Sequence, residues 1–458
     1  MLYRKITQHI EDFLLHEPNK ILLINGARQI GKSFVIRYVG KKLFKNYIEI
    51  NLKEDSEGIG VFRTVRDLND FHLQLGTLAG SRLGKKENTL VFLDEIQSYP
   101  HLLTMLKFLN QEGRYTYIAS GSQLGVALSQ TASVPIGSIS IEQMYPLDFE
   151  EFLLAMGCAQ SSIDGFQEHF NSNQPLNLSQ HEYLMQQFKL FLLVGGLPES
   201  VNKFLENRNI MHVRKVQRDI LNLYRIDASQ YDRQRQLSIR RIYDMIPSNM
   251  ENKKKRIIIN RVNDKARHKQ FSDFAEEFEY LINSGIAIPV RAISNPRFPL
   301  LESEHKNLLK LYMNDVGLLT GLLYDNNIQA VLQDRGSINL GSVYETVVAQ
   351  ELLAHGHTLC YYDNKQHGEV DFLIDDFNAL SVLPIEVKSG KDYKVHSALD
   401  RFVATPDYHI PRAIVLSNSI EVTTINGITY LPIYYVMFLK RNMAAPSDLI
   451  IPPIEPPQ

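Results

Sequence analysis

The stretch that decides the fold is ILLINGARQIGKS, residues Ile21–Ser33. Its second part, Gly26–Ser33, fits the pattern G-x-x-x-x-G-K-[ST], with an apolar run before it and a run of helical character after it. The order of strand, glycine-rich loop and helix is typical of a phosphate-binding loop, or P-loop. The alternative is a glycine-rich turn that contains a lysine by chance. The flanking strand and helix favour the P-loop.

Each part of the loop has a chemical role. Gly26 and Gly31 allow backbone N–H groups to turn toward phosphate oxygens, and the start of the helix adds partial positive charge. We expect Lys32 to meet the β- and γ-phosphates of ATP, where it also assists catalysis, and the Ser33 hydroxyl to bind Mg²⁺. The predicted nucleotide site comprises Gly26, Ala27, Arg28, Gln29, Ile30, Gly31, Lys32 and Ser33.

Acidic and polar residues follow two further apolar runs. In TLVFLDEIQ, Asp94 and Glu95 come directly after four apolar residues. Ligands bind at the carboxyl ends of strands in open α/β sheets, so we expect Asp94 to hold Mg²⁺ with Ser33, and Glu95 to act as general base. The alternative is that the two acids cap the next helix. In YIASGSQ, Ser120 and Ser122 are candidates to contact the γ-phosphate or the attacking water, although small polar residues are common at strand ends.

Five short apolar runs alternate with helical patterns between residues 20 and 144. They are KILLIN, NYIEINL, TLVFLDE, YTYIAS and SISIEQM. This alternation predicts an α/β fold with a parallel sheet and helices on both faces. We assign residues 1–150 to this P-loop NTPase domain.

The remaining chain predicts four further regions. Residues 151–230 have helical patterns, interrupted by a turn at VGGLPES, and are interpreted as a helical lid. Residues 231–305 have helical patterns followed by a hairpin, which is typical of a winged helix. Residues 306–440 contain a helix over Gly341–His355 and strands LCYYD, EVDFLID, LPIEVKSG and RAIVLS, which predict a second α/β domain. Residues 441–458 form a proline-rich tail that we expect to be flexible.

The second α/β domain contains a further group of acids. Alternate residues of a strand share one face, so Glu386 and Lys388 in PIEVKSG point together. A hairpin would bring Asp371 beside them, and the preceding helix carries Glu345. Two or three carboxylates with a neighbouring lysine can bind Mg²⁺ and activate water for phosphodiester cleavage. The alternative is an ion pair of Lys388 with Glu386 or Glu369 on a solvated sheet face.

Composition sets bounds on the class of protein. The chain has 458 residues and a formal net charge of −2, so any nucleic-acid surface must be a local patch. The densest basic cluster comprises Asn252–Arg256, Arg261, Lys265, Arg267, His268 and Lys269, which is either a DNA contact or a solvated face. The two cysteines, Cys158 and Cys360, argue against a disulfide framework and a zinc site. The chain shows no signal-peptide block or long apolar run, so we expect a cytoplasmic protein without membrane contact.

The motifs together resemble a prokaryotic family of AAA-type ATP-binding proteins, with a C-terminal domain of unknown function that resembles a restriction-endonuclease PD-(D/E)xK core. The residues that carry the resemblance are GARQIGKS, LVFLDEIQ, ASGSQ, YPLDFEEFL, GGLPES, KLYMNDVGLL, GSVYETVVAQEL, and EVDFLI with PIEVKSG. The resemblance implies ATP and Mg²⁺ as cofactors, Glu95 as the catalytic acid, and a winged helix between the two α/β domains.

One position departs from the family pattern. Similar proteins often carry Gly-Arg before the strand that leads to PLDFEEF, whereas this chain has Gly137–Ser138. If that arginine stabilises the γ-phosphate, either hydrolysis is slow in this chain or another arginine replaces it, and Arg218 and Arg225 are candidates.

The sequence therefore predicts a Mg²⁺-dependent ATPase that acts as a nucleotide-driven switch on nucleic acid, with a nuclease-like C-terminal domain. The expected partners are DNA and further copies of the chain. The alternative is a signalling or scaffold ATPase that uses the C-terminal domain only for protein interaction.

Overall fold

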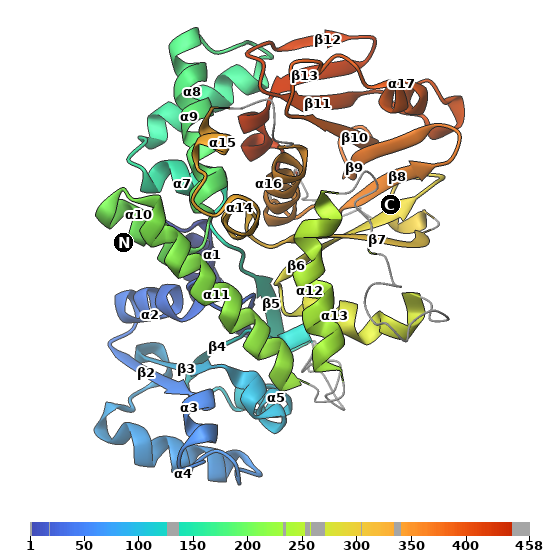
Figure 1. The fold of residues 1–458 in the computed structure, drawn as a ribbon. Coiled ribbons are helices and arrows are strands. Elements are labelled where there is room, and N and C mark those ends of the chain that lie inside the picture. The colour runs from blue at the N-terminus through green and yellow to red at the C-terminus, as the bar shows by residue number, and fades with distance from the viewer. Residues whose placement is uncertain are drawn as a thin grey trace, which may run out of the picture.

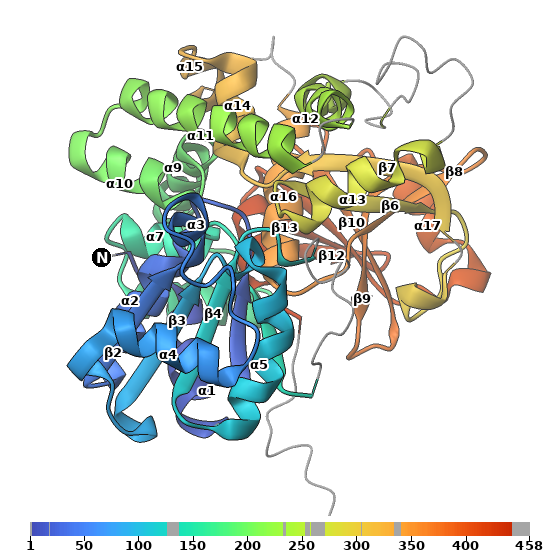
Figure 2. The ribbon, with the colours of Figure 1, turned by 90° about the horizontal axis from the view of Figure 1, so that it is seen from below.

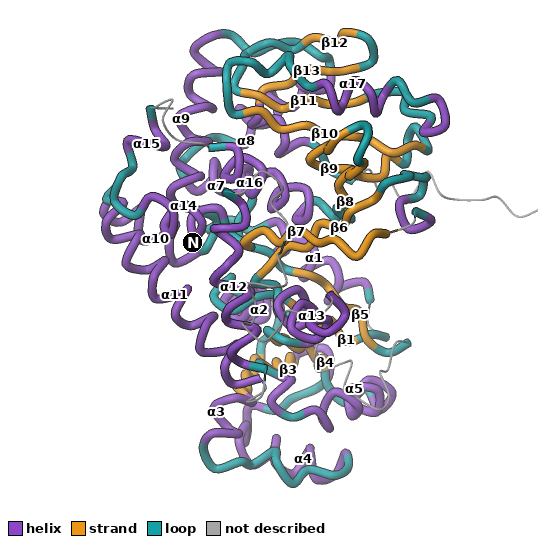
Figure 3. Tube along the Cα trace, turned by 45° about the vertical axis from the view of Figure 1, so that its right-hand side comes forward, coloured by secondary structure: helices purple, strands orange, loops and turns teal. Residues whose placement is uncertain are grey.

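The structure is a computed structural model that describes residues 2–17, 19–125, 137–231, 235–251, 257, 271–303, 305–333 and 340–441. Its strands gather in two separate sheets, with a helical region beside them (Figure 1, Figure 3). The basic cluster over residues 252–269 lies outside the described residues except for Ile257, and so does the tail after residue 441. The proposals that those segments contact DNA or are flexible therefore stay predictions.

The first sheet has five parallel strands in the order β2-β3-β4-β1-β5, which confirms the predicted P-loop fold class. Figure 2 shows its strands side by side, with the second sheet on the other side of the molecule. All five apolar runs of the sequence form strands: β1 (Ile21–Asn25), β2 (Asn46–Asn51), β3 (Thr89–Asp94), β4 (Thr116–Gly121) and β5 (Ile139–Gln143).

Helices cover both faces of this sheet. Leu22 and Ile24 of β1 pack in one apolar cluster with residues of α1 and α2, whereas Ile21 and Leu23 pack in another with residues of α4 and α5. A strand between two layers of helices is apolar along its whole length, which explains the run ILLI. The helices of this part are α1 (Lys5–His16), α2 (Lys32–Leu43), α3 (Leu52–Glu57), α4 (Leu68–Ala79) and α5 (Pro100–Glu112).

A group of helices follows the first sheet, as the patterns over residues 151–230 predict. Asp148 begins α7 with a capping box, and Asn177 begins α9 in the same way. The two glycines after α9 allow close packing, because a side chain at Gly195 would overlap Asp315 and one at Gly196 would overlap the carbonyl group of Leu147. The helices are α7 (Phe149–Ala155), α8 (Gln160–Asn171), α9 (Leu178–Val194), α10 (Pro198–Asn207), α11 (Ile210–Tyr231), α12 (Gln236–Met250) and α13 (Ala275–Asn283).

The second sheet has eight strands in the order β12-β13-β11-β10-β9-β8-β6-β7, with mixed directions. The predicted strands of the C-terminal part all appear, whereas β12 and β13 were not predicted. The strands are β6 (Ala287–Ile293), β7 (His305–Met313), β8 (Cys360–Asn364), β9 (Gly368–Asp376), β10 (Ser381–Lys388), β11 (Ala413–Ser417), β12 (Thr423–Ile425) and β13 (Ile428–Pro432).

The hairpin of β6 and β7 belongs to this second sheet, so a separate winged-helix domain over residues 231–305 is not confirmed. β6 pairs in parallel with β8, with Arg291 opposite Cys360, and this pairing joins the hairpin to the C-terminal strands. The sequence pattern showed the hairpin but not its distant partner. The turn before β6 lies close to the P-loop: Gly285 has φ of +73°, and a Cβ there would lie 3.1 Å from the amide nitrogen of Ala27.

The central helix of the C-terminal half is α16 (Gly341–Ala354), as predicted. Every residue from Ser342 to Leu352 is buried, because α16 packs against strands of the second sheet on one side and against α14 on another. A helix that is covered on all sides shows little amphipathic pattern. The other helices here are α14 (Val316–Tyr324), α15 (Gln329–Leu332) and α17 (Ser397–Val403).

Candidate nucleotide-binding site

The loop between β1 and α2 has the backbone that a P-loop requires. Gly26 and Gly31 have φ of 153° and 93°, and a side chain at Gly26 would overlap the carbonyl oxygen of Met144. Gln29 also has a positive φ, 66°, although it is not glycine. Strained backbone of this kind persists where surrounding structure holds it, and it is common in ligand sites.

Lys32, the first residue of α2, places a cation inside this loop. The residue is only 5% exposed. Its Nζ donates to the carbonyl oxygens of Gly26 at 2.9 Å and Ala27 at 2.8 Å. Burial lowers the pKa of Lys32 to about 8, although the carboxylates of Glu95 and Asp94 act in the opposite direction. A buried ammonium group that is held by carbonyl oxygens at a helix start is suited to an anionic ligand.

Asp94, at the end of β3, lies against this loop. Its Oδ2 accepts a hydrogen bond from the Ser33 hydroxyl at 2.7 Å, and its Oδ1 accepts one from the Ser120 hydroxyl. Burial raises the pKa of Asp94, and the two hydroxyl donors oppose that rise. The structure therefore brings together Ser33 and Asp94, whose oxygen atoms are of the type that Mg²⁺ prefers.

Glu95 has a left-handed backbone, with φ of 54°, directly after β3. Its Oε2 accepts from the Ser122 hydroxyl at 3.0 Å and from the Gln97 side-chain amide. Glu95 stands at the N-cap position of the short 3-10 helix Ile96–Ser98, but its side chain makes no capping hydrogen bond there, and α5 begins only after Tyr99. The structure thus orients Glu95 through Ser122, which the sequence singled out, and through Gln97, which it did not. The only sequence signal for Gln97 was its place two residues after Glu95.

A cavity of about 580 Å³ lies beside the loop, large enough for part of a nucleotide. Phe34 in the first turn of α2 is 54% exposed, so an aromatic ring is available for stacking against a base. The far wall is α10, which follows the glycine turn of GGLPES. The lining residues include Leu2, Arg4, Gln29, Gly31, Phe34, Pro198, Asn202 and Lys203.

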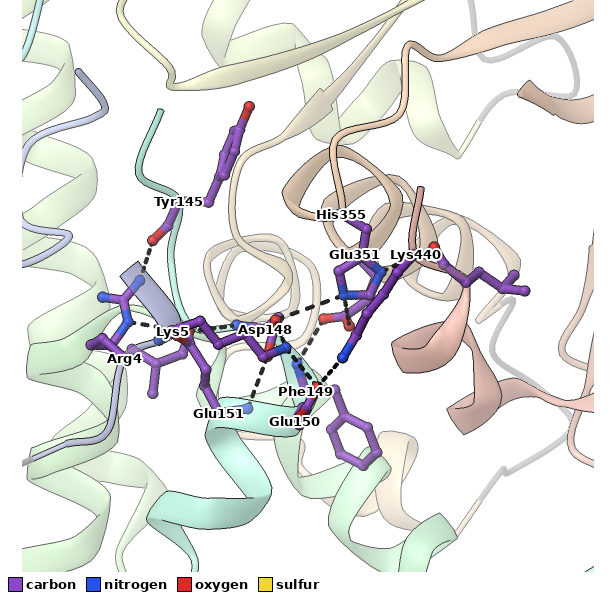
Figure 4. A network of polar contacts seen from close by, with 12 residues as sticks. Arg4, Lys5, Tyr145, Asp148, Phe149, Glu150, Glu151, Glu351, His355 and Lys440 are labelled. Atoms are coloured by element: carbon purple, nitrogen blue, oxygen red, sulfur yellow. Dashed lines mark hydrogen bonds and ion pairs between the residues drawn. The ribbon is translucent and has the colours of Figure 1, made fainter. Parts of the chain in front are cut away.

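Arg4 connects the loop to the start of α7 (Figure 4). Its Nη1 donates to the carbonyl oxygen of Ile30 at 2.9 Å, and its Nη2 donates to that of Tyr145 at 2.6 Å. Its Nε pairs with Glu151 at 3.1 Å. Sequence reasoning missed this arginine, because its partners lie far away along the chain.

The same group of contacts continues to α16 (Figure 4). The amide of Phe149 donates to Glu351 Oε1 at 2.8 Å, and Asp148 lies 3.7 Å from His355. Burial raises the pKa of Glu351 well above its usual value. Burial alone would also raise the pKa of Asp148, but Lys5 and His355 hold it well below its usual range. Polar contacts therefore run without a break from the P-loop to the central helix of the C-terminal half.

The second predicted group of acids is brought to one region of the second sheet. Lys388 Nζ lies 2.8 Å from Glu386 Oε1, and the amide of Val387 donates to Asp371 Oδ2 at 2.9 Å. Glu345 on α16 accepts from the Tyr312 hydroxyl at 3.0 Å. The charges of Glu386, Asp371 and Glu345 together raise the pKa of Lys388 against the opposing effect of burial.

The Mg²⁺ site that we expect at two or three carboxylates of this second group stays a prediction. Within the described parts of the chain, no three side chains of His, Cys, Asp or Glu are arranged to hold one metal ion. The Glu386–Lys388 pair that we considered as the alternative does form, but Glu386 is only 7% exposed and so does not lie on a solvated face. Burial raises the pKa of Glu386, and Lys388 opposes that rise.

The described helices include none that is both long and apolar enough to cross a membrane.

Three family models match the chain: an AAA domain over residues 18–153, a domain of unknown function (DUF8612) over residues 185–329, and a domain of unknown function (DUF4143) over residues 340–436. The C-terminal match therefore does not confirm the resemblance to a restriction endonuclease.

Individual relatives are distant. The uncharacterized protein MJ1544 of Methanocaldococcus jannaschii is 24% identical over 366 residues, which cover 78% of this chain and 72% of that protein. The Walker-type ATPase PABY2304 of Pyrococcus abyssi is 16% identical, with a TM-score of 0.43 over 70% of this chain and 96% of that chain. The RuvB Holliday junction branch migration motor of Thermotoga maritima is 14% identical, with a TM-score of 0.30 over 65% of this chain and 91% of that chain. Residues 18–153 match the AAA domain model, and the parallel sheet and the loop give this part of the chain the fold of a P-loop NTPase domain.

Proposed function

We propose that this protein binds ATP at Gly26–Ser33 and hydrolyses it. The observation that carries the proposal is the buried ammonium group of Lys32, which donates to two main-chain carbonyl oxygens inside a glycine loop at a helix start. Incoming phosphate oxygens can replace those carbonyls as acceptors. The exchange is favourable because a charged acceptor makes a stronger hydrogen bond than a neutral one.

The residues around the loop support one reaction sequence. Glu95 takes a proton from a water molecule, and the water oxygen forms a bond to the γ-phosphorus as the bond to the β,γ-bridging oxygen breaks. The products are ADP and inorganic phosphate. Ser122 orients Glu95, and Lys32 stabilises the negative charge on the phosphates. Ser33 and Asp94 fit Mg²⁺ by their donor atoms and contact, and a bound ion there would neutralise phosphate charge.

Calorimetric titration with ATP and Mg²⁺ tests this proposal. We expect wild-type protein to bind, and Lys32→Ala to lose about 100-fold in affinity, because a charged hydrogen-bond partner of the phosphates is removed. The matched control is Lys42→Ala, which removes a lysine from the exposed surface of the same helix and should leave affinity unchanged. Equal affinity of Lys32→Ala and wild type would reject the site.

We further propose that ATP binding changes how the protein acts on nucleic acid. The contacts of Arg4 with the loop and of Phe149 with Glu351 offer a physical connection between the nucleotide and the C-terminal half. The test is the rate of phosphate release with and without duplex DNA, at low and high salt. Stimulation that declines with salt supports a DNA-dependent switch. A rate that is the same at every DNA concentration removes nucleic acid from the function.

A second candidate function is a signalling or scaffold ATPase whose C-terminal half only binds other proteins. The observation that favours it is the second acid group, where Lys388 is paired with Glu386 and Asp371 accepts from a main-chain amide. A Mg²⁺-dependent cleavage assay distinguishes the two functions. Cleavage by wild type that is lost in Asp371→Ala, with ATP binding intact, would favour a nuclease. Equal Mg²⁺-dependent cleavage by wild type and Asp371→Ala, including none by either, would favour the scaffold.

A further inference from the structure

ATP hydrolysis on a P-loop commonly uses an arginine to stabilise charge on the γ-phosphate, and the sequence offers three positions for it. Gly137–Ser138, where relatives carry Gly-Arg, lies beside Ile21 at the start of β1, because the Ser138 carbonyl accepts from the Ile21 amide at 2.9 Å. The loop follows the opposite end of that strand, at Asn25. An arginine at that pair would thus lie at the end of the strand that is far from the loop, and it could not reach the loop of its own chain.

The two arginines of α11 that were candidates are paired with other acids. Arg218 lies 3.3 Å from Asp325, and Arg225 lies 2.8 Å from Asp244. Neither of these acids belongs to the loop or to the ends of β3 and β4. The ion pairs therefore give no reason to place either guanidinium at the phosphates.

Arg28 is the third residue of the loop itself, and it lies between α11 and Ser122, which contacts Glu95. Its Nε donates to the Ser122 hydroxyl at 3.3 Å, and Ser122 in turn donates to Glu95 at 3.0 Å. Its Nη1 forms an ion pair with Asp227 of α11. The positive charge of Arg28 also contributes to lowering the pKa of Lys32, so the two cations lie within electrostatic range.

One face of α11 holds Arg28 from two points. Tyr224 and Asp227 are three residues apart on this helix and therefore share a face. The Tyr224 hydroxyl donates to the main-chain oxygen of Arg28 at 3.0 Å, while Asp227 binds the guanidinium group. Asp227 is buried, so its charge is weakly screened by water.

We propose that Arg28 is the arginine that contacts the γ-phosphate during hydrolysis, and that Asp227 of α11 holds its guanidinium group until the phosphate competes for it. The proposal rests on the proposed ATPase function. The guanidinium group has five donors, and the contacts with Ser122 and Asp227 use two of them. The donors that remain can address phosphate oxygens from the side of Glu95.

The exchange has a consequence for α11. When the phosphate takes the guanidinium group, Asp227 loses its partner and a buried carboxylate without a partner is unfavourable. The contact between α11 and the loop is then weakened. Nucleotide state is in this way reported to the helical region by one ion pair whose members lie 199 positions apart in the sequence.

The first experiment separates binding from turnover in Arg28→Ala. We expect the ATP dissociation constant to change by no more than about threefold, while kcat falls by about 1000-fold, because the arginine acts on charge that develops in the transition state. ADP with aluminium fluoride should bind wild type tightly and Arg28→Ala no better than ADP alone. Millimolar guanidinium ion should restore part of the rate. The control is Arg37→Ala on α2, whose guanidinium pairs with Glu49 and which should keep the wild-type rate.

The second experiment tests the role of Asp227. Asp227→Asn keeps the shape of the side chain but removes its charge, so we expect kcat to rise by up to about tenfold. A kcat at or below the wild-type value would overturn the holding role. An unchanged kcat in Arg28→Ala, in protein that binds and turns over ATP, would overturn the arginine assignment alone. Wild-type protein that fails to bind ATP would instead reject the proposed function on which both rest.

Discussion

The two acid groups of this molecule use the same residue types and differ in what their lysines contact. In the first, Lys32 donates to the carbonyl oxygens of Gly26 and Ala27 inside the P-loop. In the second, Lys388 is bound by Glu386, a carboxylate two residues earlier on the same strand. Neutral carbonyl partners leave the full charge of Lys32 available to a ligand. A carboxylate partner neutralises Lys388 within the protein.

The carboxylates differ in the same way. Asp94 accepts from two hydroxyl groups, including that of Ser33, which is itself a candidate metal ligand. Asp371 accepts from the main-chain amide of Val387, a contact that fixes β9 against β10. The comparison teaches that a motif of acids and a lysine predicts chemistry only when its charges are not already balanced by one another. Four experiments can break or sharpen it.

The largest expected effect is on turnover at the first group. Glu95→Gln should keep ATP binding but lower kcat by about 1000-fold, because the amide cannot accept the proton of the attacking water. Bound ATP should therefore persist in the variant, which a filter-binding assay with labelled ATP measures. Phosphate release at the wild-type rate would remove Glu95 from the role of general base.

The charge of Lys32 should make ATP binding depend on pH. Its pKa in the free protein is lowered to about 8 by burial, so the charged form declines as pH rises above that value. We expect affinity to fall by up to about tenfold per pH unit above pH 8, where ATP itself no longer titrates. Calorimetry between pH 7 and pH 9.5 measures this slope.

The matched variant for this slope is Lys32→Arg, which stays charged across the range and should show a flat profile at whatever affinity it retains. The stability of the protein should depend on pH in the opposite direction from its affinity for ATP. Between about pH 8 and pH 10.5 the folded protein binds fewer protons at Lys32 than the unfolded chain does, so the free energy of unfolding should rise with pH there. A wild-type affinity that is constant to pH 9.5 would contradict the lowered pKa.

Loss of the second lysine should affect stability and leave nucleotide binding unchanged. Lys388→Ala leaves the buried carboxyl group of Glu386 without its partner, which should cost about 2 kcal/mol of unfolding free energy. Denaturant unfolding measures the loss. Combining Lys388→Met with Glu386→Gln should recover most of it, because both charges are then gone. A destabilised double variant would show that the pair contributes more than charge balance.

The smallest effect is expected at Glu351, in the contacts that link the two groups. Burial raises the pKa of Glu351 well above its usual value, so folding favours the neutral form of this carboxyl group. Glu351→Gln keeps an acceptor for the Phe149 amide and should change stability by less than about 1 kcal/mol at pH 7. Wild-type stability should decline as pH rises from about 4.5 toward the raised pKa, and the variant should lack that decline. Thermal unfolding across this pH range compares the two.

The P-loop sheet could be predicted because its signals are local. Each strand is a short apolar run such as Leu90–Leu93, and the loop between Gly26 and Ser33 carries its own geometric requirement for glycine. The parallel pairing of β6 with β8 could not be predicted, since it joins segments far apart in the chain and no local pattern records it.

The candidate site was likewise predictable only where its contacts follow from the order of strands and loops. Ser33 contacts Asp94 because the loop and the acids both follow the carboxyl ends of neighbouring parallel strands, where ligand-binding residues gather as a general rule. The ion pair of Arg28 with Asp227 depends on how α11 crosses the loop, and that is a property of the whole packed molecule. The sequence also could not show that Lys388 forms an ion pair with Glu386, because the spacing of two residues does not reveal which contacts their side chains make in the folded protein.

The close approach of Gly285 to Ala27 places the turn before β6 directly against the P-loop. A Cβ atom at Gly285 would lie 3.1 Å from the Ala27 nitrogen, which is closer than ordinary van der Waals contact. Gly285→Ala would add a Cβ atom that crowds the loop, and it would also strain the backbone, which has φ of +73° at this residue. Hydrogen–deuterium exchange at the Ala27 amide, measured without nucleotide, would then show how strongly the hairpin of the second sheet restrains local opening of the P-loop.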